Sequence, residues 1–93
     1  MNKKQETLVI LMEECGEVIQ ECSKILRFDC GTEKLTKELG DLQCMMNYAA
    51  SILNISHKDI GKAQDQKRHK LIKWSNIVEV KEGIKRYNES KAD

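Results

Sequence analysis

The sequence predicts an all-α fold, and three observations point to it. The chain of 93 residues contains no proline. Charged residues make up 33% of the chain and aromatic residues only 4%, a composition typical of helices rich in Glu and Lys rather than of a sheet. Apolar residues recur at alternating steps of three and four, which is the period of one helical face. We therefore expect an antiparallel helical hairpin followed by a third helix.

The first helix is predicted to run from about Lys3 to about Phe28. After it, Gly31 suits a left-handed C-terminal cap, and Thr32 suits the N-cap of the next helix. The apolar stripe that should face the core consists of Leu8, Leu11, Cys15, Val18, Cys22 and Ile25.

The second helix is predicted from Glu33 to Leu53, and it repeats the same spacing. Two such stripes in antiparallel helices can pack together as the core of a hairpin. The stripe of the second helix consists of Leu35, Leu39, Leu42, Met46, Ala49 and Leu53.

A third helix is predicted from about His57 to about Trp74, because Ser56 followed by Asp59 resembles a helix start. Its apolar content is low, and it is the basic element of the chain. The tail from residue 77 to residue 93 fits a helix by its spacing but alternates like a strand around residues 78–80, so both alternatives stay open. We expect a single domain over residues 1–93, with its core in residues 3–76.

A chain this small buries only about 60% of its unfolded surface when it folds alone. Several apolar residues also lie off the two stripes, and an uncovered apolar stripe usually marks an interface. We therefore expect a homo-oligomer, a dimer or a tetramer, that completes the helical bundle. The residues off the stripes are Val9, Ile10, Met12, Ile19, Met45, Tyr48 and Ile52.

Charge and composition exclude several classes of partner. The formal net charge is +1, so no global field would recruit nucleic acid or an acidic membrane. No apolar run resembles a signal or a membrane span, which predicts a cytoplasmic protein with no membrane partner. The four cysteines form no CxxC pair, so we expect reduced thiols, with Cys15 and Cys22 in the core.

Two pairs of acidic residues stand next to the predicted core stripes. Glu14 and Glu17 are three apart on the first helix, and Glu38 and Asp41 are three apart on the second. Each pair lies on one helical face, and a hairpin can bring the two faces together. Converging carboxylates repel by about 4 kcal/mol at the effective dielectric of a partly buried site, so they need a cation. Hard oxygen ligands favour Mg²⁺, with Mn²⁺ as the alternative, whereas a solvated acidic face is the competing interpretation.

The pattern Glu13-Glu14-x-x-Glu17 followed by Glu38-x-x-Asp41 resembles the EExxE…ExxD signature of MazG-like all-α nucleoside triphosphate pyrophosphohydrolases. Three segments also resemble the short phage and bacterial members, so the similarity covers residues 8–76. The segments are EECGEVIQECSKILRF, KELGDLQ and KRHKLIKWSN. It implies conversion of a nucleoside triphosphate to a monophosphate and pyrophosphate. It also implies that Glu14, Glu17, Glu38 and Asp41 bind Mg²⁺, and that Glu13 orients or deprotonates the attacking water.

Candidate substrate contacts lie on the second and third helices. Lys67, Arg68 and Lys70 fall within one turn and are candidates to bind the phosphates, with a solvated basic face as the alternative. Met45 and Tyr48 form an apolar shelf beyond Asp41 where a base or sugar can rest, with plain packing as the alternative. Two functions compete with catalysis: a non-catalytic helical dimerisation module, and the weaker possibility of nucleic-acid binding through residues 67–73.

Overall fold

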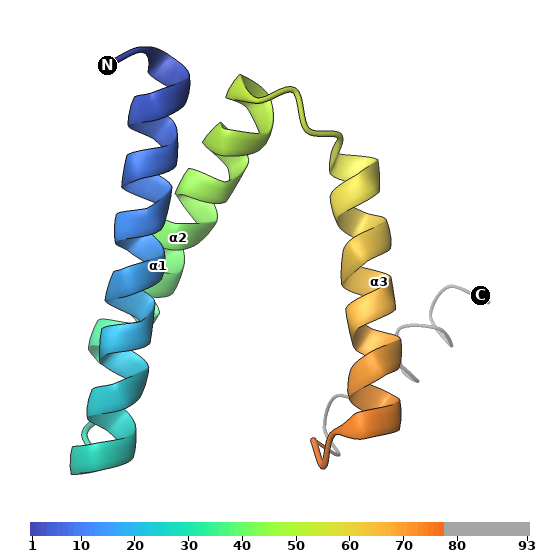
Figure 1. Cartoon of the computed structure of the whole chain (residues 1–93). Coiled ribbons are helices and arrows are strands. Elements are labelled where there is room, and N and C mark those ends of the chain that lie inside the picture. Colours follow the sequence, from blue (N-terminus) through green and yellow to red (C-terminus); the bar gives the residue numbers. More distant parts are fainter. Residues whose placement is uncertain (78–93) are drawn as a thin grey trace. The chain divides into compact units, whose positions relative to one another are not determined.

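The computed structural model describes residues 1–77, which form three α-helices and no strand (Figure 1). Helix α1 spans Lys3–Phe28, α2 spans Glu33–Ile52 and α3 spans His57–Trp74. The chain divides into two compact units. The first is Met1–Ile55, the hairpin of α1 and α2, and the second begins at Ser56 and contains α3. The predicted all-α class, with a helical hairpin and a third helix, is confirmed.

Short polar side chains fix where the helices begin. Asn2 Oδ1 accepts a hydrogen bond from the Gln5 backbone N–H at 2.8 Å, and Gln5 Oε1 accepts one from the Asn2 N–H at 3.0 Å, which completes a capping box on α1. Ser56 Oγ accepts from the Asp59 N–H at 3.3 Å, as their spacing predicts. Thr32 precedes α2 but forms no side-chain cap. The start of α2 is therefore correctly placed by Thr32, although the expected capping bond is missing.

The left-handed residue that ends α1 is Asp29, not Gly31 as the sequence suggested. Asp29 has φ 48°, a conformation that Asp tolerates, and its N–H donates to the Ile25 carbonyl at 2.9 Å. Gly31 has no positive φ. A Cβ atom there would meet only the carboxylate end of the flexible Glu33 side chain, which can move aside, so neither conformation nor space requires glycine at this position. The second turn places Asn54 at φ 55°, and α2 ends at Ile52, one residue earlier than predicted.

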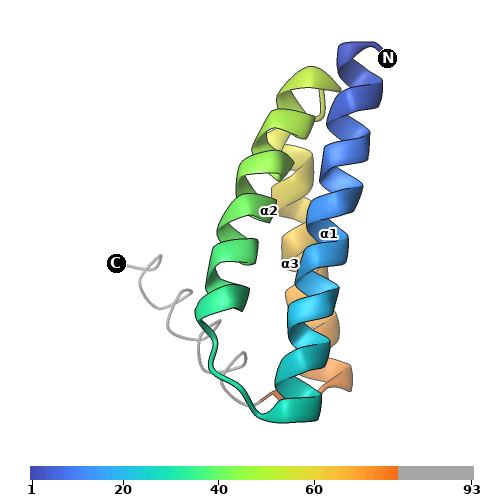
Figure 2. The ribbon, with the colours of Figure 1, turned by 90° about the vertical axis from the view of Figure 1, so that its left-hand side faces the viewer.

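Helices α1 and α2 run antiparallel and lie side by side along their length (Figures 1 and 2). The most buried residues of α1 are Thr7 and Glu21, and Glu14, midway between them, is half-buried. These three residues are spaced by seven, so they lie on one face of the helix, and that face points at α2. We call Thr7, Glu14 and Glu21 the polar seam.

The predicted core stripe of α1 is therefore wrong in part. Leu8, Cys15 and Cys22 are exposed, and the expectation that both cysteines lie in the core is incorrect. The physical reason is that apolar residues cover a wide arc of α1, so the spacing identifies an apolar side of the helix but not the line on it that meets α2. Compared with the predicted orientation, α1 is rotated about its own axis by about one residue position, so that Glu14 rather than Cys15 faces α2.

The core of the hairpin is small. On α2, Ala49 and Ala50 are buried, whereas Leu39 and Met46, which belong to the predicted stripe, are 43% and 46% exposed. No large side chain among the described residues is fully buried. Of the seven residues expected to lie uncovered off the core stripes, Met12, Ile19 and Tyr48 are exposed, whereas Val9, Ile10, Met45 and Ile52 are half-buried. The homo-oligomer that they suggested stays a prediction.

No helix within residues 1–77 is both long enough and apolar enough to cross a lipid bilayer. The two alternatives for the tail, helix or strand, fall almost wholly on residues 78–93, which lie outside the described part of the chain.

Candidate metal centre

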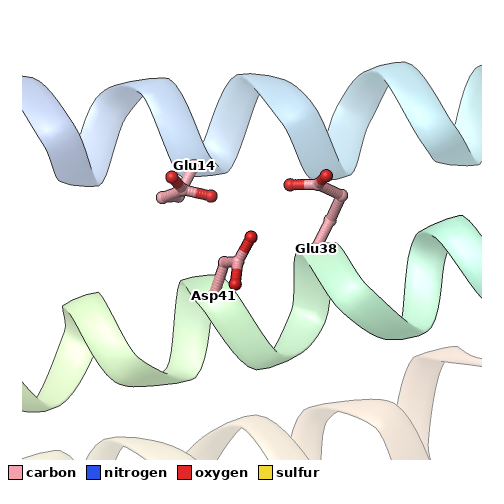
Figure 3. Close-up of side chains that lie close together, drawn as sticks. All are labelled: Glu14, Glu38 and Asp41. Atoms are coloured by element: carbon pink, nitrogen blue, oxygen red, sulfur yellow. The ribbon is translucent and has the colours of Figure 1, made fainter.

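Three carboxylates from the two helices of the hairpin converge on one point. Glu14 comes from α1, and Glu38 and Asp41 come from α2. Each offers one oxygen, and these three oxygens lie within 4.8 Å of one another. Figure 3 shows the three side chains in the space between the two ribbons. We call Glu14, Glu38 and Asp41 the acidic cluster. It arises because residues three apart share a face of α2, and that face meets the polar seam of α1.

One carboxylate oxygen of Glu14 is shielded from solvent. This Oε2 atom is buried and has no hydrogen-bond partner within the described residues. Burial raises the pKa of the Glu14 carboxyl above its ordinary value, and the charges of Asp41 and Glu38 raise it further. A buried carboxylate oxygen without a partner is unfavourable, and a cation bound at this point would relieve both the desolvation and the repulsion.

A residue that the sequence analysis did not single out, Lys37, also belongs to this site. Lys37 Nζ donates a hydrogen bond to Asp41 Oδ2 at 2.8 Å and lies 3.5 Å from Glu38 Oε1. The bond to Asp41 and the charges of both acids raise the pKa of the Lys37 ammonium. The signal was present in the sequence, because Lys37 and Asp41 are four apart and therefore neighbours on one helical face.

Not every predicted metal ligand joins the cluster. Glu17 is exposed, one turn beyond Glu14, and its carboxylate is not among the oxygens that lie within 4.8 Å of one another. Its charge nevertheless contributes to the raised pKa of Glu14. Glu13 is exposed, about 100° around α1 from Glu14. The structure thus brings together three of the four predicted ligands.

The candidate substrate residues belong to both compact units of the chain. On α2, Met45 is half-buried one turn beyond Asp41, and Tyr48 is exposed. On α3, Lys67, Arg68 and Lys70 are all exposed, and Arg68 Nη1 donates to Asp65 Oδ1 at 2.6 Å. The three α3 residues belong to the second unit, whereas the acidic cluster belongs to the first.

The acidic cluster fits a hard divalent cation. Three carboxylate oxygens from two rigid helices match the donors that Mg²⁺ and Mn²⁺ prefer. Mg²⁺ is usually bound by one or two carboxylates together with water and phosphate oxygens, so a site with three acids leaves coordination positions for a phosphate. The donor set contains no thiolate or imidazole, which softer metals would favour.

Comparisons of the chain with protein-family models, with curated proteins and with solved structures each found no match. The resemblance to MazG-like enzymes therefore rests on the acidic motifs and on the three sequence segments around them.

Proposed function

We propose that the chain is a Mg²⁺-dependent nucleoside triphosphate pyrophosphohydrolase, a MazG-like enzyme that converts a ribo- or deoxyribonucleoside triphosphate to the monophosphate and pyrophosphate. The observation that carries the proposal is the convergence of Glu14, Glu38 and Asp41 from two helices, with an unpartnered buried oxygen on Glu14. The resemblance of the acidic motifs to that family supports the same conclusion.

In this proposal the acidic residues of the hairpin have different roles. Glu14, Glu38 and Asp41 hold the metal, which when bound neutralises charge that develops on the phosphates. Glu17, one turn from Glu14, is proposed to supply an additional carboxylate to the metal. Glu13 is proposed to orient the attacking water and to accept its proton. Because two helices fix the metal ligands, the triphosphate meets a preorganised site.

Substrate contacts outside the cluster are part of the proposal. Lys67, Arg68 and Lys70 of α3 would bind the phosphates through charge-assisted hydrogen bonds. Met45 and Tyr48, which follow Asp41 on α2, would support the base or sugar. We further propose that the enzyme works in the cytoplasm, in nucleotide metabolism of a bacterium or its phage, and as a homo-oligomer.

The direct test is to incubate the full chain with a panel of nucleoside triphosphates and Mg²⁺, and to measure the release of pyrophosphate and monophosphate. Glu38→Gln should abolish release, and Glu6→Gln, the same chemical change in the first turn of α1, should not. Full activity in the Glu38→Gln protein would refute the assignment of the site.

The alternative, a non-catalytic helical dimerisation module, makes a different prediction. It predicts no release of pyrophosphate from any triphosphate, and no change in metal binding when Glu38 is replaced. Circular dichroism of both variants must show that the helices are retained, so that a loss of turnover reports on the site and not on the fold.

A further inference from the structure

Lys37 is the one cation within residues 1–77 that forms an ion pair with the acidic cluster. Its Nζ atom donates to Asp41 Oδ2 at 2.8 Å and lies 3.5 Å from Glu38 Oε1, so a single ammonium contacts two of the three proposed metal ligands. The Lys37 side chain is 70% exposed and therefore free to turn. A metal ion that takes these same oxygens would leave this ammonium without its partners.

The acidic cluster has an inner and an outer side. Glu14 Oε2 is buried and the Glu38 side chain is only 14% exposed, whereas the Asp41 side chain is 42% exposed. Lys37 is bonded to the exposed member of the cluster. A phosphate that reaches a metal ion here from solvent would therefore arrive beside Asp41 and Lys37.

Lys37 does not by itself complete the cluster. It contacts Asp41 and Glu38, but Glu14 Oε2 still has no hydrogen-bond partner within the described residues. A divalent ion among the three carboxylates attracts each of them about twice as strongly as an ammonium at the same distance. The metal ion is thus the better cation for the inner side, which leaves the outer side to Lys37.

A phosphate bound at this point needs a cation besides the metal. A nucleoside triphosphate with one bound Mg²⁺ remains negatively charged, and residues 1–55 contain nine acidic and six basic side chains. The hairpin as a whole therefore repels such a substrate. Sites that bind phosphates commonly combine metal ions with Lys or Arg for this reason.

The other basic residues of the hairpin are less well placed. Lys34 lies one turn before Lys37 on α2 and forms no ion pair within residues 1–77. The basic residues of α1 all lie ten or more positions from Glu14, which is about 15 Å along the helix. They are Lys3, Lys4, Lys24 and Arg27.

We propose that Lys37 exchanges partners when metal and substrate bind. Its Nζ atom leaves Asp41 and donates a hydrogen bond to a non-bridging oxygen of the phosphate that the metal holds. This inference rests on the proposed function and adds a phosphate-binding residue to it. Because Lys37 and Asp41 belong to the same helix, the contact is independent of α3.

The exchange requires only a short movement of the ammonium. Neighbouring oxygens around a six-coordinate Mg²⁺ ion, each about 2.1 Å from it, are about 3 Å apart. A phosphate oxygen next to Asp41 in this shell would therefore lie about as far from the Asp41 carboxylate as Lys37 Nζ does now. The flexible stem of lysine and the three donors of its ammonium allow rotation from one oxygen to the other.

The exchange gives Lys37 opposite effects on the two ligands. Before phosphate binds, the ammonium competes with the metal for Asp41 and Glu38. Once phosphate is present, the same ammonium holds it in place. A lysine that only supports the helix would favour neither ligand over the other. An effect of net charge alone would be nearly equal at Lys34, one turn away.

The first test uses the full chain, Mn²⁺ and inorganic pyrophosphate, with isothermal titration calorimetry. In Lys37→Gln the Kd for Mn²⁺ alone should fall, whereas the Kd for pyrophosphate on the Mn²⁺-loaded protein should rise about tenfold or more. Lys37→Arg keeps the charge and the N–H donors, so it should bind pyrophosphate within about threefold of the wild type. Lys34→Gln, the matched control, should also stay within about threefold.

The outcomes separate this inference from the proposed function. If the wild type binds pyrophosphate and Lys37→Gln binds it equally well, the inference is overturned and the metal site stands. An equal loss in Lys34→Gln would also overturn it, because the effect would then come from net charge. If the Mn²⁺-loaded wild type binds no pyrophosphate, the metal–phosphate site of the proposed function fails, and this inference fails with it.

The second test follows the ammonium itself by NMR, with Mg²⁺ in place of Mn²⁺. The nitrogen signal of Lys37 Nζ, identified by its absence in Lys37→Arg, should shift when Mg²⁺ is added and shift again when pyrophosphate follows. A signal that does not respond to Mg²⁺ would overturn the displacement from Asp41. A signal that responds to Mg²⁺ but not to pyrophosphate would overturn the contact with phosphate.

Discussion

Lys37 Nζ lies 2.8 Å from Asp41 Oδ2, one turn away on α2, so the hairpin supplies its own cation to the acidic cluster. The same ammonium lies 3.5 Å from Glu38 Oε1. A metal ion that binds these same oxygens of Glu38 and Asp41 would therefore displace the ammonium. An exposed ion pair of this kind contributes little to stability, so the displacement is easily offset by metal binding.

We predict that Lys37→Gln strengthens metal binding. Removing the ammonium makes the potential at the cluster more negative and removes a competitor for Asp41, so the Kd for Mn²⁺ should fall several-fold. Isothermal titration calorimetry, or the electron paramagnetic resonance signal of free Mn²⁺, measures this directly. Lys34→Gln is the matched control, because Lys34 forms no ion pair within residues 1–77. Weaker binding in Lys37→Gln would contradict the competition.

Metal binding should stabilise the folded hairpin. A ligand that binds only the folded state adds about 2.7 kcal/mol at a concentration 100 times its Kd. For a chain of this length, each kcal/mol raises Tm by about 4–8 °C. Mg²⁺ should therefore raise Tm of the wild type, at fixed protein concentration, and should leave Tm of Asp41→Asn nearly unchanged. An equal rise in both proteins would show that the ion binds elsewhere.

The pKa of Glu14 predicts a pH dependence in the absence of metal. Because this pKa is raised in the folded state, the folded state holds its proton more tightly than the unfolded chain. The free energy of unfolding should therefore decrease as pH rises from the ordinary glutamate pKa through the raised one. Urea denaturation in EDTA at a series of pH values measures it. The decrease should be absent in Glu14→Gln and present in Glu6→Gln.

The basic residues of α3 should affect substrate binding if they contact the phosphates. Lys67→Ala and Arg68→Ala should raise KM about tenfold or more, since charge-assisted hydrogen bonds contribute about 1.5–3 kcal/mol. They should also lower kcat if the contact strengthens as charge develops in the transition state. Lys58→Ala, at the opposite end of α3, is the control. Wild-type kinetics in both Lys67→Ala and Arg68→Ala would confine the chemistry to the hairpin.

The helix boundaries could be predicted from the sequence because they depend on local chemistry. Ser56 and Asp59 are three apart, and the bond between them is the cap that this spacing implies. The bounds of α1 and α3 agree with the prediction, and α2 ends one residue early. The left-handed residue was assigned wrongly, because Asp29 and Gly31 both suit that conformation and the choice depends on how the turn packs.

The rotation of α1 could not be predicted in the same way. Leu11, Val18 and Ile25 belong to the predicted stripe and remain half-buried, while Leu8, Cys15 and Cys22 turn outward. Two overlapping apolar stripes on one helix are equally compatible with its spacing, and only the contact with α2 distinguishes them. The same rotation brings Glu14 inward, so the acidic cluster depends on a choice that spacing alone leaves open.

The polar seam has a consequence for laboratory evolution. Glu14 of the seam lies with Glu38 and Asp41 at the contact between α1 and α2, where uncharged side chains of similar size would stabilise the hairpin. Selection of random variants for heat resistance alone should therefore enrich neutral residues at positions 14, 38 and 41. Such variants would keep the helices and lose the metal ligands, so a screen for a more robust protein must also require metal binding.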